Sequence, residues 1–193
     1  AIMDFLAFNL QQHNEFTFVD GIYSLLPGHL LIYNLHTDEH RIERWYTPKP
    51  RKIEHPSDLR NCFVESVRSR MVSDVPIGVT LSGGIDSTAI TGALDSYLTD
   101  TFRTYSLIVP GSSIDESRYI EEVGRHTKTE SFFTSINPTT FLNEVEDFVS
   151  AMEEPVGSLA VYSQYIVFKL AHQQQAKVLL DGQGGDELFA GYV

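Results

Sequence analysis

The chain has 193 residues, 42% of them hydrophobic, which is enough for one well-buried domain or for one domain and part of another. Its net charge of −12 and pI of about 4.9 disfavour nucleic acid as a partner, because proteins that bind phosphate backbones usually present a basic face. The single cysteine, Cys62, excludes an intramolecular disulfide and predicts a reducing, cytoplasmic setting. The longest nearly apolar stretch, residues 159 to 171, is too short and too polar to cross a bilayer, so we expect a buried helix and no membrane partner.

The first 47 residues predict a small β segment. Pro27-Gly28 is typical of a turn, and the HLLIYNL run at residues 29 to 35 predicts a strand of a ribbon or hairpin. Prolines and basic residues then alternate up to Pro56, a pattern typical of an extended linker. We therefore expect three parts: residues 1 to 47, a linker at 48 to 56, and a second domain over 57 to 193.

Helices and strands alternate through the second domain. Ser57 is predicted to cap a first helix, in which Cys62 would be a packing residue on an apolar face with Leu59, Phe63, Val67 and Met71. In chain order we then expect strands over residues 75–81, 101–109, 130–136 and 177–180, and helices after residue 88, over 115–126, around 141–152 and over 161–174. This alternation predicts an α/β fold: a mostly parallel sheet flanked by helices, with the short β segment at the N-terminus.

The octapeptide LSGGIDST, residues 81 to 88, joins the first of these strands to a helix. Its glycines admit positive φ and close approach of a ligand, and we expect Ser87 or Thr88 to cap the helix. Amides at a helix start can hold phosphate oxygens without a basic side chain. The loop therefore predicts an anion site.

Asp86 is in conflict with a bare phosphate. A carboxylate about 4 Å from a phosphate charge is repelled by roughly 4 kcal/mol at an effective dielectric near 20, and a helix dipole offsets only about 0.3 to 2 kcal/mol of this. A hard cation such as Mg²⁺ between the two resolves the conflict, and it calls for a second acid. The segment DGQGGDE, residues 181 to 187, follows another strand at the same sheet edge and supplies Asp186.

The two loops resemble those of the synthetase domain of the glutamine-hydrolysing asparagine synthetase family. Ser82 to Ser87 match its SGG-hydrophobic-DS loop, and the second loop is matched by Gly185-Asp186-Glu187 and Gly191-Tyr192. The resemblance extends to nearly the whole chain through Ile114 to Glu122, Glu154-Pro155, and Gly21 to Tyr33 with Trp45-Tyr46. It implies an ATP-pyrophosphatase fold of the adenine-nucleotide α-hydrolase type, preceded by the last part of a glutaminase domain.

By this resemblance, ATP and Mg²⁺ are the expected cofactors, with Asp86 and Asp186 as catalytic acids and metal ligands. The implied nucleotide site consists of Leu81, Ser82, Gly83, Gly84, Asp86, Ser87, Leu107 and Gly182, the two leucines lying beside adenine. The implied reaction activates a small carboxylic acid as an acyl-adenylate, with release of pyrophosphate, and amidates it with ammonia from a glutaminase domain. Whether the chain forms a homodimer is left open.

Three departures from the family pattern limit this interpretation. Gln183, which we include among the catalytic residues, stands where many members have glutamate and cannot act as a carboxylate base, and Asp181 stands where serine is frequent. Both leave the acceptor acid open between aspartate and a related acid. The family's amino-terminal cysteine nucleophile is missing, and its pyrophosphate-binding lysine would lie beyond Val193, so we predict little or no amide formation by residues 1 to 193 alone.

Other functions are compatible with parts of this sequence. A non-catalytic ATP-binding module would keep both loops. A serine hydrolase would use Ser82 as nucleophile, with His126 or His172 as base, but it leaves Asp86 and the second acidic loop unexplained. A sulfur-inserting RNA enzyme would need reactive cysteines or a basic surface, and a Walker-type kinase would need a GxxxxGK[ST] motif that the sequence does not contain.

Overall fold

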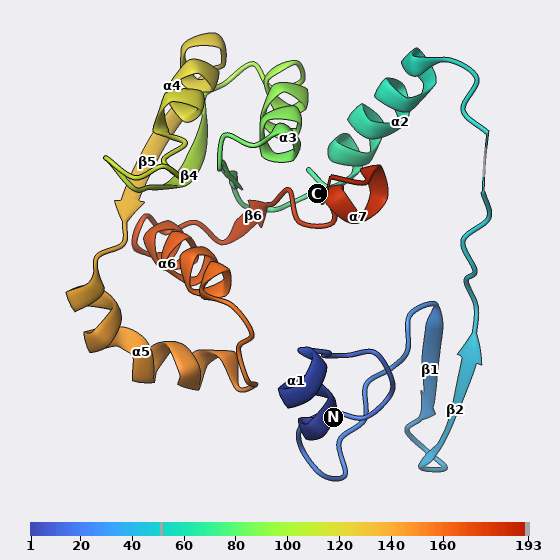
Figure 1. The fold of residues 1–193 in the computed structure, drawn as a ribbon. Coiled ribbons are helices and arrows are strands. Elements are labelled where there is room, and N and C mark those ends of the chain that lie inside the picture. The colour runs from blue at the N-terminus through green and yellow to red at the C-terminus, as the bar shows by residue number, and fades with distance from the viewer. Residues whose placement is uncertain (51, 192–193) are drawn as a thin grey trace. The chain divides into compact units, whose positions relative to one another are not determined.

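The computed structural model describes residues 1–50 and 52–191, which form two compact units, Ala1–Lys52 and Ile53–Val193 (Figure 1). The division between the units falls inside the linker predicted at residues 48 to 56. Assignment of the first unit to a glutaminase domain stays a prediction. Each unit has its own secondary structure and is described separately below.

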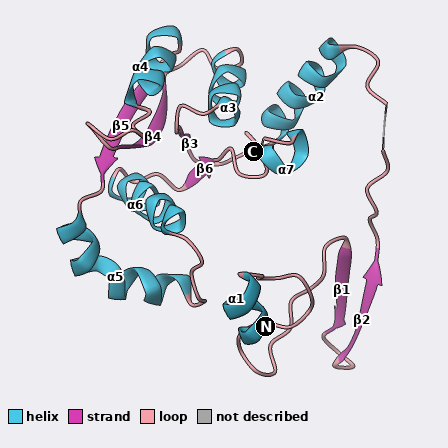
Figure 2. Cartoon of the chain, viewed as in Figure 1, coloured by secondary structure: helices cyan, strands magenta, loops and turns pink. Residues whose placement is uncertain are grey.

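The first unit contains a short helix and a β-hairpin. Helix α1 spans Ile2–Phe8, and strands β1, His29–Asn34, and β2, Glu39–Arg44, pair antiparallel (Figure 2). Gly28 adopts φ +74°, and its carbonyl accepts the N–H groups of Trp45 and Tyr46 at 3.0 and 3.1 Å, which joins the two ends of the hairpin. The predicted β segment is therefore present.

The second unit is built on a four-stranded parallel sheet of order β5-β4-β3-β6. The strands are β3, Ile77–Thr80, β4, Phe102–Ile108, β5, Thr129–Ser135, and β6, Val178–Leu180. The chain adds β4 and β5 on one side of β3 and then returns to place β6 on the other side. The carboxyl ends of β3 and β6 therefore flank a topological switch point, where open α/β sheets bind their ligands.

Helices cover both faces of this sheet (Figure 1). On one face, α2 and α3 pack through Val67, Ala93 and Leu94 against Val79 and Phe102. On the other face, Val167 and Ala171 of α6 pack against Tyr105, and α5 packs on α6 through Phe148. The helix bounds are α2, Pro56–Ser69; α3, Ile85–Asp95; α4, Ser117–His126; α5, Pro138–Met152; α6, Leu159–Gln173; and α7, Gly185–Phe189.

The α/β fold with a parallel sheet and flanking helices is confirmed, and the buried helix expected at residues 159 to 171 is α6. Across the described residues, no helix has both the length and the apolar character needed to span a bilayer.

Two predictions for α2 are wrong. The helix is capped by His55 rather than Ser57, because Pro56 occupies the first turn with its φ already helical, and the Asp58 carboxylate accepts the His55 N–H at 3.3 Å. Cys62 is exposed and does not pack in the core. The apolar face is centred on Phe63 and Val67, and Cys62 points about 100° away from its neighbour Phe63 around the helix.

Candidate functional site

The first glycine-rich loop begins where β3 ends. Leu81 extends the strand pairing by donating its N–H to the Tyr105 carbonyl at 2.9 Å, and Gly83 then turns the chain with φ +86°. The predicted cap at Ser87 or Thr88 is wrong, because the residue that caps α3 is Gly84, whose carbonyl accepts the Thr88 N–H at 3.1 Å. This earlier start places Asp86 in the first turn of the helix.

Two serine hydroxyls hold the shape of this loop. The Ser82 and Ser87 Oγ atoms lie 3.0 Å apart, the Ser82 N–H donates to Ser87 Oγ at 3.2 Å, and the Gly84 N–H donates to Ser82 Oγ at 3.2 Å. Ser87 is buried, whereas Ser82 is exposed. The amides of Ile85 and Asp86 precede the first i to i−4 bond of α3 and have no acceptor within the helix, as is usual at helix starts. The loop therefore has the geometry of an anion site.

The second glycine-rich loop contacts the first at Asp86. A Cβ added at Gly185 would overlap the Asp86 carboxylate, because Cγ and both carboxylate oxygens all lie nearer than real Cβ contacts allow. A Cβ added at Gly182 would lie 3.2 Å from the Asp86 Cβ and 3.1 Å from the Ser87 amide nitrogen. The two loops follow Thr80 and Leu180, which are 100 residues apart in the chain. They approach this closely only because both contact positions are glycine.

The other acids of the second loop lie differently. Asp186 follows Gly185 directly, but its carboxylate lies against Gly191 at the end of α7. The structure thus brings Asp86 to the second loop and places Asp186 one residue beyond that contact. Gln183 is exposed, and the Tyr192 of the Gly-Tyr pair lies outside the described residues.

Asp181 organises this loop, a role that the sequence analysis missed. Its Oδ1 accepts the Gln183 N–H at 3.0 Å, and its Oδ2 accepts a hydrogen bond from Gln164 Nε2 of α6 at 3.2 Å. The available signal was Gln164, one of three polar residues in the nearly apolar stretch that predicted α6.

The two leucines predicted beside adenine lie on opposite faces of the sheet. Leu81 is 1% exposed and, by strand alternation, shares the face of Val79 with α2 and α3. Leu107 packs with Tyr105 on the face covered by α6. A nucleotide reaches Leu81 only if neighbouring groups move, so the contact of either leucine with adenine stays a prediction.

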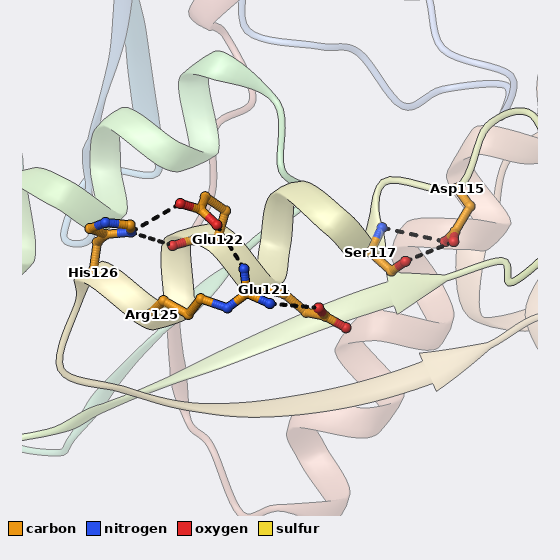
Figure 3. Close-up of polar contacts among 6 residues, drawn as sticks. All are labelled: Asp115, Ser117, Glu121, Glu122, Arg125 and His126. Atoms are coloured by element: carbon orange, nitrogen blue, oxygen red, sulfur yellow. Dashed lines mark hydrogen bonds and ion pairs between the residues drawn. The ribbon is translucent and has the colours of Figure 1, made fainter.

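The connection between β4 and α4 supports the first loop. A Cβ added at Gly83 would lie 3.0 Å from the Tyr119 Cβ and 3.3 Å from the Glu116 carbonyl oxygen. The Asp115 carboxylate holds this connection by accepting a hydrogen bond from the Ser117 hydroxyl at 2.7 Å (Figure 3). It also accepts the Val109 N–H at 3.1 Å. These hydrogen bonds, chiefly that from the Ser117 hydroxyl, lower the pKa of Asp115, whereas burial raises the pKa of Glu116.

The histidines required by a serine hydrolase lie away from Ser82. His126 is at the far end of α4, where its ring lies 2.9 Å from the Glu122 carbonyl oxygen (Figure 3), and the ten residues of α4 span about 15 Å. His172 is in the last turn of α6, which precedes the amino end of β6, whereas Ser82 follows the carboxyl end of β3. Ser82 Oγ lies within hydrogen-bond distance of Ser87 and Gly84 instead.

The charges and ligand types at the loops fit a magnesium–phosphate group. Neither 81–88 nor 181–191 contains lysine or arginine, so a polyphosphate here needs a cation. Asp86 and Asp186 offer hard carboxylate oxygens, which suit Mg²⁺, an ion that takes its remaining ligands from phosphate and water. No group of three or more His, Cys, Asp or Glu side chains suited to a metal occurs among the residues that the structure describes.

Comparisons with known proteins show which family the chain is similar to. The profile of the family described as asparagine synthase matches residues 58–193. Amidase chry2 of Gibberella zeae is 26% identical over 99% of the chain and 34% of its own length. Asparagine synthetase (glutamine-hydrolyzing) 1 of Bacillus subtilis is 32% identical over 70% of the chain and 21% of its own length. Asparagine synthetase (glutamine-hydrolyzing) 2 of Oryza sativa is 27% identical over 88% of the chain and 31% of its own length. The chain thus spans about one third or less of the length of these curated relatives.

Proposed function

Because the chain belongs to the asparagine synthase family, we propose that it is the part of an ATP-dependent carbon–nitrogen ligase that binds ATP and activates a carboxylic acid for amidation. The observation that carries this proposal is the contact of Gly182 and Gly185 with Asp86, which joins two glycine-rich loops at the switch point of a parallel sheet. At this junction the backbone amides at the start of α3 and the Asp86 carboxylate lie close together.

Each group at the junction has a defined task in this proposal. The amides at the start of α3 and the exposed Ser82 hydroxyl bind phosphate oxygens, and Gly83 and Gly84 let the phosphates approach the backbone. Asp86 and Asp186 hold Mg²⁺, which when bound neutralises the charge of the leaving pyrophosphate. Asp186, which follows Gly185 directly, would supply the second carboxylate to the ion.

The proposed reaction begins with attack of a carboxylate on ATP. The acid attacks the α-phosphorus, the bond from that phosphorus to the bridging oxygen breaks, and pyrophosphate leaves. Ammonia from a glutaminase domain attacks the activated carbonyl, AMP leaves, and the proton lost from the nitrogen passes to water. Gln183 is an amide, so it contacts the acceptor as a hydrogen-bonding group and does not take the proton.

Acid-dependent pyrophosphate exchange tests this function. The full-length protein is incubated with ATP, Mg²⁺, labelled pyrophosphate and a panel of carboxylic acids that includes aspartate. We expect label in ATP only when an accepted acid is present. Absence of exchange with every acid, despite ATP binding, contradicts the ligase proposal.

Aspartate-to-asparagine substitutions inside and outside the two loops test whether pyrophosphate exchange depends on the loop carboxylates. Asp86→Asn and Asp186→Asn should each reduce exchange by at least about a hundredfold, because each removes a charged metal ligand. Asp100→Asn removes an exposed carboxylate just before the amino end of β4, on the far edge of the sheet, and serves as the control. Pyrophosphate exchange at the wild-type rate in either loop variant would show that the two acids do not share the metal.

A non-catalytic ATP-binding module is the second candidate, and Gln183 favours it, because an amide replaces the carboxylate frequent in the family. That module would bind ATP with Mg²⁺ and support no exchange with any acid.

A further inference from the structure

Asp181 is the first residue after β6, and its two carboxylate oxygens bind groups from different elements. Oδ1 accepts the Gln183 N–H at 3.0 Å and closes a turn within the second loop, while Oδ2 accepts Gln164 Nε2 from α6 at 3.2 Å. Both side chains are partly buried, so solvent competes less for this hydrogen bond than at an exposed position. The loop is thereby tied to the helix that lies against the face of the sheet.

The turn that Asp181 closes contains Gly182, and a second turn links Gly182 to Gly185; these are the two glycines that meet the first loop. Gly182 follows Asp181 directly, and its carbonyl accepts the Gly185 N–H at 3.1 Å. These are the two positions at which an added Cβ would meet Asp86. A displacement of the turn by a few tenths of an ångström would therefore move the backbone against the Asp86 carboxylate or away from it.

We infer that Asp181 and Gln164 are a positioning pair that fixes the second loop against Asp86, and that α6 is thereby part of the support of the ATP site. The assignment of that site to ATP rests on the proposed function; the positioning of the loop does not. Asp181 touches no reacting atom in this role. It acts through the backbone of Gly182 and Gly185.

An exchange of charge between the two partners tests the pair in the full-length protein. Gln164→Glu places a carboxylate opposite Asp181 and replaces an attraction by a repulsion. Adding Asp181→Asn to that variant restores a donor and an acceptor, because the introduced amide donates to the introduced carboxylate and its oxygen still accepts the Gln183 N–H. Gln173→Glu adds the same charge at an exposed position in the last turn of α6 and is the control.

The main measurement is amide hydrogen exchange over residues 82–88 and 182–187, which does not depend on activity. Gln164→Glu should speed exchange in both segments by about tenfold or more, the value expected for loss of a hydrogen bond to a charged group, and the double variant should recover most of the protection. Unchanged exchange in Gln164→Glu, or no recovery in a folded double variant, overturns the inference. If Gln164→Glu does not fold, Gln164→Ala must still speed exchange in the second loop.

A kinetic measurement separates positioning from general destabilisation. In Gln164→Glu the KM for ATP should rise about tenfold, and the double variant should return it toward the wild-type value, while Gln173→Glu leaves it unchanged. If amide hydrogen exchange in the two loops changes but the KM for ATP stays constant, the link between the pair and the ATP site is overturned. Lack of pyrophosphate exchange in the wild type would instead count against the proposed function, and the hydrogen-exchange result would stand by itself.

Discussion

Two features of the structure meet at Asp86. It lies in the first turn of α3, where a negative charge gains about 0.3 to 1 kcal/mol from the helix dipole, and its carboxylate is against the backbone of Gly185. A carboxylate that only stabilises the start of a helix would have the first feature and not the contact with Gly185. The contact with a second glycine-rich loop is the feature that a helix-start acid does not require.

Substitution of Gly185 tests this contact. Gly185→Ala inserts a methyl group where the Asp86 carboxylate lies, so we expect ATP affinity in the presence of Mg²⁺ to fall by at least about tenfold, as for a shift that costs 1.4 kcal/mol. Gly92→Ala is the control, because an added Cβ there meets nothing within 4 Å. The control should leave affinity unchanged and raise the free energy of unfolding by about 0.4 to 1 kcal/mol, since Gly92 is inside α3. Equal ATP affinity in Gly185→Ala and wild type, measured by titration calorimetry, would show that the contact does not shape the site.

Asp115 gives the connection before α4 a dependence on pH. Hydrogen bonds from the Ser117 hydroxyl and the Val109 N–H place its folded pKa below the ordinary value of 3.8. Its contribution to stability is therefore present above that value and is lost as pH falls through the lower folded pKa. We expect Asp115→Asn to be less stable than wild type at pH about 7, with the difference shrinking below pH about 4. Urea unfolding at several pH values measures it, and a difference that stays constant down to pH about 2 contradicts the assigned hydrogen bonds.

Individual site residues could be predicted from the sequence where the chemistry is local. The Ser82 to Ser87 motif and its conflict between Asp86 and phosphate indicate the first loop without knowledge of the fold. The role of Asp181 depends on Gln164, a partner 17 residues away on a helix whose rotation the sequence does not specify. Cys62 shows the same limit, because its exposure depends on which side of α2 meets α3.

At the scale of elements, α5 is held to α6 by a cluster of aromatic rings. Phe148 is 4% exposed and lies edge-on to Tyr162, with ring centroids 5.2 Å apart. Lys169 and Glu144 add an ion pair at 3.0 Å, but the lysine is 40% exposed, so this pair contributes only about 0 to 1 kcal/mol. The aromatic contact is therefore the main attachment of α5.

Truncation of Phe148 tests this attachment. Phe148→Ala should lower the free energy of unfolding by about 3 to 5 kcal/mol, because it removes a buried ring and leaves a cavity. Leu142→Ala, on the same helix at a position 70% exposed, should change it by less than about 0.5 kcal/mol. A similar loss in both variants, measured by urea unfolding, would mean that α5 does not dock through its Phe148 face.

In the second unit the kinds of element could be predicted well because its strands and helices differ in hydrophobic period, whereas helix α1 of the first unit was not predicted. Helix starts were less accurate: the glycine turn and Pro56 begin α3 and α2 earlier than the serines suggest. The order β5-β4-β3-β6 could not be read from the sequence, because pairing β6 with β3 joins segments 100 residues apart. That pairing is what brings the two loops to one edge.

At the scale of the whole molecule, the two units differ in how much they bury. None of the described residues of Ala1–Lys52 is buried, and large apolar side chains such as Leu6 and Trp45 are 72% and 67% exposed. The second unit has apolar cores on both faces of its sheet. Hydrophobic burial is the dominant favourable contribution to folding, so the units should differ in stability.

Separate expression tests that difference. Residues 53–193 should unfold in one cooperative transition followed by circular dichroism, whereas residues 1–52 should show no cooperative transition, because so small a chain without a buried core does not offset its conformational entropy. A sharp transition in residues 1–52 alone would show that the hairpin and α1 form a stable unit by themselves.

The measurement that tests the central claim most directly is titration of ATP into the full-length protein with and without Mg²⁺. If Asp86 and Asp186 bind phosphate through a shared divalent ion, wild type should bind ATP only with Mg²⁺. In Asp86→Asn and in Asp186→Asn, the addition of Mg²⁺ should no longer raise the affinity for ATP. ATP affinity that is the same in Mg²⁺ and in a chelator, or that is unaffected by either substitution, would contradict the account.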